Sequence, residues 1–168
     1  MTQLLFRTDP YQREAAATVS ALTDEGGVVL DATVFYPTGG GQPGDSGWLE
    51  WGGNRLGIAT AVTGMDARII LVPSEPVPLP PVGARVVQQL DWDRRHRHMR
   101  VHTALHLQSV AVPFGVTGSA ISATHGRLDF NMPDAPDDRD ALEHALNDFV
   151  EADARVSEGW ITEAELDA

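Results

Sequence analysis

Short apolar runs separated by turn residues fill the first ninety positions of the chain. Apolar or alternating stretches lie at 27–30, 33–36, 48–51, 58–62, 68–72 and 85–91. Glycine, asparagine and aspartate stand between several of them, as at 52–54 and 63–66. Several short strands with turns between them are typical of a small antiparallel barrel or sandwich. An open sheet of the same strands is the alternative that the pattern leaves.

From about residue 91 the apolar positions follow the period of a helix instead. Residues 94–111 contain no glycine or proline and end before Pro113 and Gly115, which predicts one long helix. Two short strands are expected within 119–130, around the turn at 124–126. The aspartates at 137–140 predict the start of a second helix that runs to about Val150. Its expected buried face carries Leu142, Ala145, Leu146, Phe149 and Val150.

The pattern therefore predicts an α+β protein in two parts. Residues 1–90 form a small N-terminal antiparallel β-barrel that carries a glycine-rich loop, and residues 91–168 form an α+β unit. The whole chain has 168 residues, of which 42 % are apolar and 21 % charged, a globular composition. No apolar run approaches the roughly 20 residues that span a bilayer, and no secretory signal is evident, so no membrane partner is expected.

Cysteine and charge narrow the chemistry further. The chain has no cysteine, which excludes a disulfide framework and any cysteine-ligated zinc within these residues. Its absence also fits a cytoplasmic protein. The net charge is −12, and all twelve cations are arginines, so a global basic face for nucleic acid is absent. One local cluster remains as a candidate for phosphate contacts: Arg94, Arg95, Arg97 and Arg100. The alternative is a helix face paired with Asp91 and Asp93.

A glycine-rich loop at 35–47 formally matches the spacing of a dinucleotide-binding motif at Gly39, Gly41 and Gly44. That interpretation fails because the loop lies between strands and no helix follows. A P-loop is excluded because no lysine follows the glycines. The loop then serves either a close approach to a ligand, with Gln42 offering donors and an acceptor, or a tight turn with Gln42 exposed.

His102 and His106 lie one helical turn apart, a spacing that lets two imidazoles reach one metal ion. The metalloprotease motif fails, because Thr103 stands where the catalytic glutamate would be. A helix that supplies two ligands leaves a zinc site incomplete. The other interpretation is an amphipathic face with one packed and one solvated histidine.

Two of these segments together resemble a known family. Residues 31–45 (DATVFYPTGGGQPGD), followed by DWDRR at 91–95 and MRVHTALHL at 99–107, are similar to the alanyl-tRNA synthetase editing domain. They are most similar to the free-standing AlaX-type trans-editing proteins, and RLDF at 127–130 adds to the likeness. The resemblance implies a barrel followed by the two-layer α+β editing core shared by alanyl- and threonyl-tRNA synthetases.

The resemblance also implies a function. It is hydrolysis, in trans, of the ester in Ser-tRNA(Ala), and of Gly-tRNA(Ala) as a further substrate, with zinc as cofactor and the tRNA(Ala) acceptor end as partner. Gln42, His102 and His106 are the implied catalytic residues, and the two histidines the implied zinc ligands. Substrate contacts are expected from Thr33, Gly40, Gly41 and Gln42, and tRNA contacts from Arg94, Arg95 and Arg100.

One departure from the family pattern is large. The family completes its zinc site with a later Cys-x-x-x-His pair, and this chain has no cysteine and ends at Ala168. We therefore expect either a fragment of a longer chain or a natural variant without zinc. Two further functions stay open: a non-catalytic tRNA-binding module, and a metal-dependent hydrolase of small esters or amides that shares only the fold.

Overall fold

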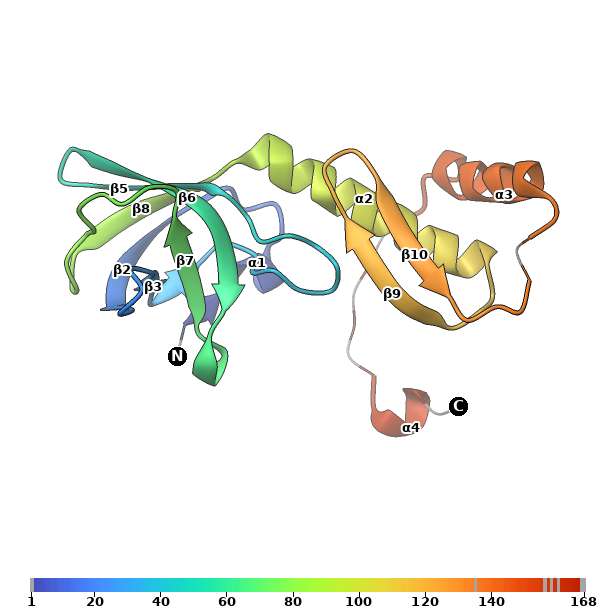
Figure 1. The fold of residues 1–168 in the computed structure, drawn as a ribbon, viewed down its shortest axis with the longest axis horizontal. Coiled ribbons are helices and arrows are strands. Elements are labelled where there is room, and N and C mark those ends of the chain that lie inside the picture. Colours follow the sequence, from blue (N-terminus) through green and yellow to red (C-terminus); the bar gives the residue numbers. More distant parts are fainter. Residues whose placement is uncertain (1, 135, 156, 158, 160, 167–168) are drawn as a thin grey trace.

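The first half of the chain closes into a barrel (Figure 1). The computed structural model describes residues 2–134, 136–155, 157, 159 and 161–166. Six antiparallel strands follow one another around the barrel in the order β2-β3-β7-β6-β5-β8. Their bounds are β2 Glu14–Leu22, β3 Val28–Leu30, β5 Gly47–Trp51, β6 Asn54–Thr63, β7 Ile69–Pro73 and β8 Arg85–Leu90. The predicted barrel is thus confirmed.

Closure depends on the pairing of β2 with β8, which runs from Glu14 opposite Gln89 to Thr18 opposite Arg85. Alternate residues of each strand face inward, as in β8, where Val86, Gln88 and Leu90 are buried and Arg85 and Val87 are exposed. The hydrophobic core cluster of the described residues lies inside this barrel and extends beyond the strands to Phe6, Val34 and Phe35. The barrel is therefore a rigid base for the loop that leaves it.

The strand expected at 33–36 is mostly absent, and the structure gives the reason. Only β4, Ala32–Thr33, forms, in parallel pairing with β1, Gln3–Leu4, ahead of the short helix α1, Leu5–Thr8. The next backbone amides donate to side chains instead of to a neighbouring strand. Val34 N donates to Gln88 Oε1 at 3.0 Å, and Tyr36 N donates to Asp45 Oδ2 at 2.7 Å. The apolar run marks burial here rather than a strand.

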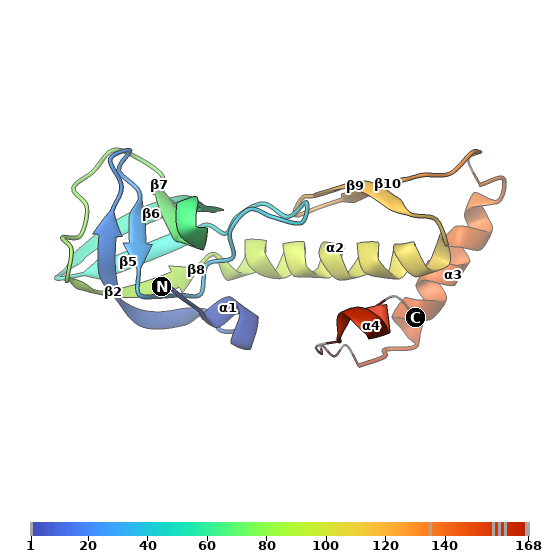
Figure 2. The same cartoon turned by 90° about the horizontal axis from the view of Figure 1, so that it is seen from below.

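The second half is built on one long helix, α2, Trp92–Ala111. Asp91 caps it by accepting from Arg94 N at 3.2 Å, so the helix begins two residues before the predicted start. Figure 2 shows α2 leaving the barrel with the β9–β10 hairpin beside it and α3 at its far end. The hairpin comprises β9, Val116–Ile121, and β10, Gly126–Phe130. The remaining helices are α3, Arg139–Glu151, and α4, Glu163–Leu166, and a 3-10 turn, η1, spans Met65–Ala67.

Helix α3 differs from the sequence prediction. Asp138 caps it, accepting from Ala141 N at 2.8 Å, but none of its residues is buried. Leu142, Ala145 and Leu146 are half-buried, whereas Phe149 and Val150 are 38 % and 59 % exposed, so the expected buried face is only partly covered. No helix in the described ranges has the length and apolar character that crossing a bilayer requires.

The glycine-rich loop joins the two halves through its final residues. Arg94 Nη1 donates to Gly44 O at 2.8 Å, and Asp91 N donates to Ser46 O at 2.9 Å. Between them, Asp45 forms an ion pair with Arg95, and the two side chains are 1 % and 3 % exposed. Arg95 also donates to Val34 O at 3.3 Å and to Pro10 O at 3.4 Å. The first turn of α2 is thereby held against the barrel.

The middle of the same loop touches the hairpin. Ile121 N donates to Gly41 O at 2.9 Å. A Cβ at Gly41 would lie 2.3 Å from Ser119 Oγ and 2.9 Å from the Ser119 carbonyl oxygen, so only glycine allows this approach. One loop thus contacts both α2 and β9.

We predict that Gly41→Ala separates the hairpin from the loop, whereas Gly40→Ala does not. Both positions have positive φ, +77° at Gly41 and +59° at Gly40, so each alanine costs roughly 1 kcal/mol in backbone strain. Only the Gly41 variant adds a clash, because the nearest atom to a Cβ at Gly40 is Tyr36 Oη at 3.7 Å. Hydrogen exchange of the Ile121 amide is the measurement. Equal protection in the two variants would contradict this account.

We predict that Arg95→Met lowers the free energy of unfolding by about 3–5 kcal/mol, because it leaves the Asp45 carboxylate buried without a counter-charge. Denaturant unfolding of the single variant and of the Arg95→Met/Asp45→Asn double variant measures the effect. The double variant should recover part of the loss, since it removes both charges. A single variant within about 1 kcal/mol of the wild type would remove the ion pair from this role.

Candidate functional site

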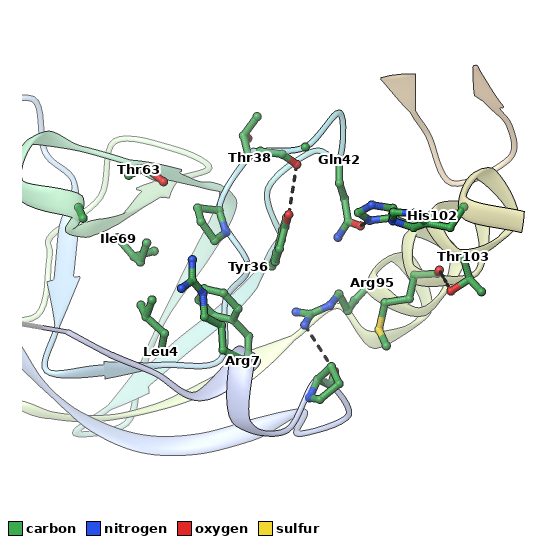
Figure 3. Close-up of a pocket in the computed structure, with 18 of the residues that line it drawn as sticks. Leu4, Arg7, Tyr36, Thr38, Gln42, Thr63, Ile69, Arg95, His102 and Thr103 are labelled. Atoms are coloured by element: carbon green, nitrogen blue, oxygen red, sulfur yellow. Dashed lines mark hydrogen bonds between the residues drawn. The ribbon is translucent and has the colours of Figure 1, made fainter. Parts of the chain in front are cut away.

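A cavity of about 1010 Å³ lies where the barrel, the glycine-rich loop and α2 meet (Figure 3). Helix α1 contributes Arg7, the loop contributes Gln42, and α2 contributes Met99, His102 and His106. Pro10 and Tyr36 complete the part of the wall next to Arg95. The cavity is therefore built from four segments that are distant in sequence.

The glycine-rich loop presents Gln42 through a tight turn. Gly39 and Gln42 exchange two backbone hydrogen bonds of 3.0 Å, and the two residues between them have positive φ. Positive φ at both central positions is the geometry of a type I′ turn, which glycine adopts without strain. Gln42 is only 3 % exposed, so the interpretation of an exposed glutamine in a plain turn does not hold.

Gln42 and His102 form the polar contact of the cavity. His102 Nδ1 lies 3.0 Å from Gln42 Oε1, so the ring donates and the amide oxygen accepts. This bond places the proton on Nδ1 and leaves the Nε2 lone pair available. Burial lowers the pKa of His102, and the neighbouring His106 lowers it further. The imidazole is therefore held in the neutral form, which can accept a proton or bind a metal.

His106 lies directly along the helix from His102. Their rings are stacked, with centroids 5.0 Å apart and planes inclined by 13°, and His106 is exposed. In the described part of the chain no group of three or more His, Asp or Glu side chains could share a metal ion. Protein zinc usually takes three or four protein ligands. The two imidazoles alone supply fewer ligands than a zinc ion usually takes.

Of the predicted substrate-binding residues, Gly40 and Gln42 line the cavity, and Gly41 contacts the hairpin instead. Thr33 is not among the lining residues. It is 1 % exposed, donates to Gln88 Oε1 at 3.1 Å and accepts from Phe35 N at 3.1 Å. The structure thus brings Gln42 and His102 together, and it places Thr33 behind them in the barrel.

The predicted tRNA-binding arginines do not share one surface. Arg94 donates to Gly44 O and, at 3.4 Å, to Ser46 Oγ, while Arg95 is buried in its ion pair. Arg100 is exposed. The guanidinium groups of the first two therefore have partners inside the protein.

Arg7, Tyr36 and Met99 are among the residues of the cavity wall that sequence reasoning missed. Tyr36 was read as part of a strand, and Met99 as one position of a helix face. Arg7 stands in a segment without apolar periodicity, so no local signal marks it. Arg7 is exposed, and it adds a cation to a wall that is otherwise mostly apolar and amide-bearing.

The arrangement suits attack of water on a polarised carbonyl. A neutral imidazole can orient or deprotonate a water molecule, and an amide nitrogen can donate to a developing oxyanion. The buried Gln42 carries both an acceptor, used by His102, and such a donor. The cavity thus combines a proton acceptor with a hydrogen-bond donor on one wall.

Comparisons with known proteins agree on the family. Residues 7–94 match the family model described as tRNA synthetases class II (A). The chain is 31 % identical to the alanyl-tRNA editing protein AlaX-M of Pyrococcus horikoshii, covering 95 % of this chain and 75 % of that protein. It is 34 % identical to the AlaX-M of Methanosarcina barkeri, covering 89 % of this chain and 65 % of that protein.

A longer relative matches in the same way. The alanine–tRNA ligase of Pyrobaculum arsenaticum is 34 % identical over 92 % of this chain, which spans 18 % of the ligase. The chain thus corresponds to less than a fifth of the ligase, to 65 % of one editing protein and to 75 % of the other. The AlaX-M of Pyrococcus horikoshii, of which this chain covers 75 % at 31 % identity, establishes the family. The chain belongs to the alanyl-tRNA synthetase family and, within it, to the AlaX-type editing proteins.

Proposed function

We propose that this chain hydrolyses the aminoacyl ester of mischarged tRNA(Ala) in trans, with serine as the principal amino acid and glycine as the second. The 3′ end of the tRNA would enter the cavity and place the ester beside Gln42 and His102. Relatives named alanyl-tRNA editing proteins support the reaction class. The observation that carries the proposal is the part-buried Gln42–His102 hydrogen bond of 3.0 Å in the cavity wall.

In this mechanism each residue of the pair has one task. Neutral His102 accepts a proton from, or orients, the attacking water through Nε2. Its Nδ1 stays bonded to Gln42 Oε1, which fixes the ring tautomer. The Gln42 amide nitrogen donates to the oxygen that becomes negative in the tetrahedral intermediate. Removing one such donor typically costs about 100- to 1000-fold in rate.

Selectivity for serine needs a partner for its hydroxyl, because a site built to bond a hydroxyl rejects the analogue that lacks it. We propose Thr33 for this role; because it lies behind the cavity wall and is 1 % exposed, its hydroxyl would reach the seryl hydroxyl only after the wall shifts on substrate binding. A threonine hydroxyl has one donor and two lone pairs. Thr33 uses its donor on Gln88 and one lone pair on Phe35 N, which leaves one lone pair for the seryl hydroxyl.

Zinc and the tRNA contacts are proposed on the same basis. His102 and His106 would supply two of the ligands of a zinc ion, with His102 then binding the metal through Nε2 instead of accepting a proton, and the metal would polarise the substrate. Arg100 is the exposed member of the predicted arginine set and would meet a phosphate of the acceptor end. Arg94 and Arg95 would act by holding the loop and α2 in place.

Deacylation of Ser-tRNA(Ala) by the 168-residue chain tests the function. We expect turnover in the wild type and about a 100- to 1000-fold lower rate in Gln42→Ala, which removes the oxyanion donor. Gln12→Ala is the matched control, because the Gln12 side-chain amide donates to the nearby Glu14 carbonyl oxygen and Gln12 is not among the residues that line the cavity. The assay includes a zinc-supplied and a chelator-treated sample, and the zinc proposal requires lower activity in the latter.

Other outcomes identify the competing functions. Binding of tRNA without turnover, with zinc supplied, would indicate a non-catalytic module. Equal activity on small aminoacyl esters and on Ser-tRNA(Ala) would indicate a hydrolase that shares only the fold. Full activity of Gln42→Ala would remove the Gln42–His102 pair from the mechanism.

We predict that Thr33→Val lowers the ratio of kcat/KM for Ser-tRNA(Ala) to kcat/KM for Ala-tRNA(Ala), because valine offers no hydroxyl to serine. Thr33→Ser is the control that keeps the hydroxyl and should keep the ratio. Both rates are measured for each variant, so a general loss of stability cancels. An unchanged ratio in Thr33→Val would transfer the role to a threonine that lines the cavity, such as Thr38.

A further inference from the structure

Beside the cavity, at the start of α2, lies a group of three rings and one guanidinium, here termed the aromatic platform: exposed Tyr11 and Arg13, and half-buried Trp92 and His96. The Trp92 and His96 rings are stacked, with centroids 5.4 Å apart and planes inclined by 15°. Tyr11 lies 5.7 Å from Trp92, and the Arg13 guanidinium lies 4.4 Å from the Trp92 ring centre. Aromatic rings combined with arginine are the chemistry on which unpaired RNA bases stack.

The platform is held rigidly but is not covered. Tyr11 N donates to Asp9 Oδ1 at 2.9 Å, and Arg95 Nη2 donates to Pro10 O at 3.4 Å. Leu90 N donates to Arg13 O at 2.9 Å, so the segment that carries Tyr11 is held before and after it. Tyr11 nevertheless stays 60 % exposed. If the group served only to attach this segment to α2, packing would cover the ring more fully. A rigid, exposed ring loses little entropy when a base stacks on it.

The platform continues into the cavity. Trp92, His96, Met99 and Thr103 follow one another at steps of four, three and four residues, so they form one stripe along α2. Met99 and Thr103 line the cavity, as does Pro10, the residue before Tyr11. A strand that leaves the cavity along this stripe meets the platform next.

The length of the stripe matches a short single strand. At about 1.5 Å per residue, the ten steps along the helix from Trp92 to His102 correspond to roughly 15 Å. Stacked nucleotides advance by about 3.4 Å each, so roughly four would span this distance. A tRNA ends in an unpaired stretch of about this length. Net charge −12 repels RNA at long range, so contacts that do not depend on charge matter more here.

We propose that the aromatic platform stacks an unpaired base near the 3′ end of the tRNA, a few nucleotides before the one that carries the amino acid. This proposal rests on the proposed function for the direction in which the RNA enters. The platform acts in binding and takes no part in the hydrolytic step. Tyr11 supplies the exposed stacking face, and the Trp92–His96 pair supports it.

Binding of uncharged tRNA(Ala) to the full chain tests the platform independently of hydrolysis. The dissociation constant is measured for the intact transcript and for one that lacks its unpaired 3′ nucleotides. We expect Tyr11→Leu to weaken binding of the intact transcript by about 5- to 150-fold, the effect of losing one base stack, and to leave the shortened transcript unchanged. Tyr11→Phe should restore binding, because it keeps the ring.

Phe114→Leu is the matched control, since Phe114 is an exposed aromatic residue at the far end of α2, 45 % exposed, and should not affect binding. Unfolding curves confirm that each variant is folded. Unchanged binding by Tyr11→Leu, or equal weakening for both transcripts, would overturn the proposal. Deacylation by the wild type, together with unchanged tRNA binding by Tyr11→Leu, would keep the proposed function and reject the platform. Weaker tRNA binding by Tyr11→Leu, without turnover by the wild type, would keep the platform and reject the proposed function.

Discussion

The buried ion pair between Asp45 and Arg95 is the contact on which the candidate site depends. Gln42 belongs to a loop of the barrel, and His102 belongs to a helix that leaves the barrel. The ion pair fixes the loop three residues after Gln42 and the helix two turns before His102. Burial raises the pKa of the Asp45 carboxyl, and the Arg95 guanidinium and the Tyr36 amide oppose that rise. The pair thus carries a desolvation cost, and what it provides is one fixed arrangement of loop and helix.

The site also needs the loop to stay close to the hairpin. A side chain at position 41 would meet the backbone of Ser119, whereas Gln42 must turn back toward α2. Two residues with positive φ in succession achieve both within one tight turn. The glycines of this loop therefore provide a close approach between two pieces of backbone, with Gln42 as the polar group that the turn delivers to the cavity. The hydrogen bond from His102 then selects the tautomer with a free Nε2.

The barrel could be predicted from the sequence because strand alternation and turns are local signals. The alternation in β8 from Arg85 to Leu90 is one example, and its buried residues are those that the pattern indicates. The run at 33–36 was misread, because its amides are paired with the side chains of Gln88 and Asp45, which lie 54 and 9 residues away from their partners. The apolar face of α3 was misread because periodicity shows that a face exists and does not show that another element covers it.

The site residues divide in the same way. The spacing of His102 and His106 was enough to place them on one helix face, and their stacked rings agree with that. The burial of Gln42 and its bond to His102 depend on a contact across 60 residues, which no local pattern contains. The sequence makes Arg94 and Arg95 candidates for phosphate contacts, because consecutive arginines usually face solvent. Their partners, Gly44 and Asp45, become visible only when the loop and the helix are placed together.

This use of arginine inside the protein affects how such an acidic chain would bind RNA in the proposed function. A guanidinium that holds a carbonyl or a carboxylate is not free to displace counterions from phosphates, so only a few phosphates are neutralised. The long-range field of a chain with net charge −12 adds no attraction. Recognition therefore falls to short-range contacts: the shape of the cavity, the amide of Gln42 and rings that stack on bases. In the proposed function, such contacts would confine affinity to the few nucleotides at the end of the tRNA.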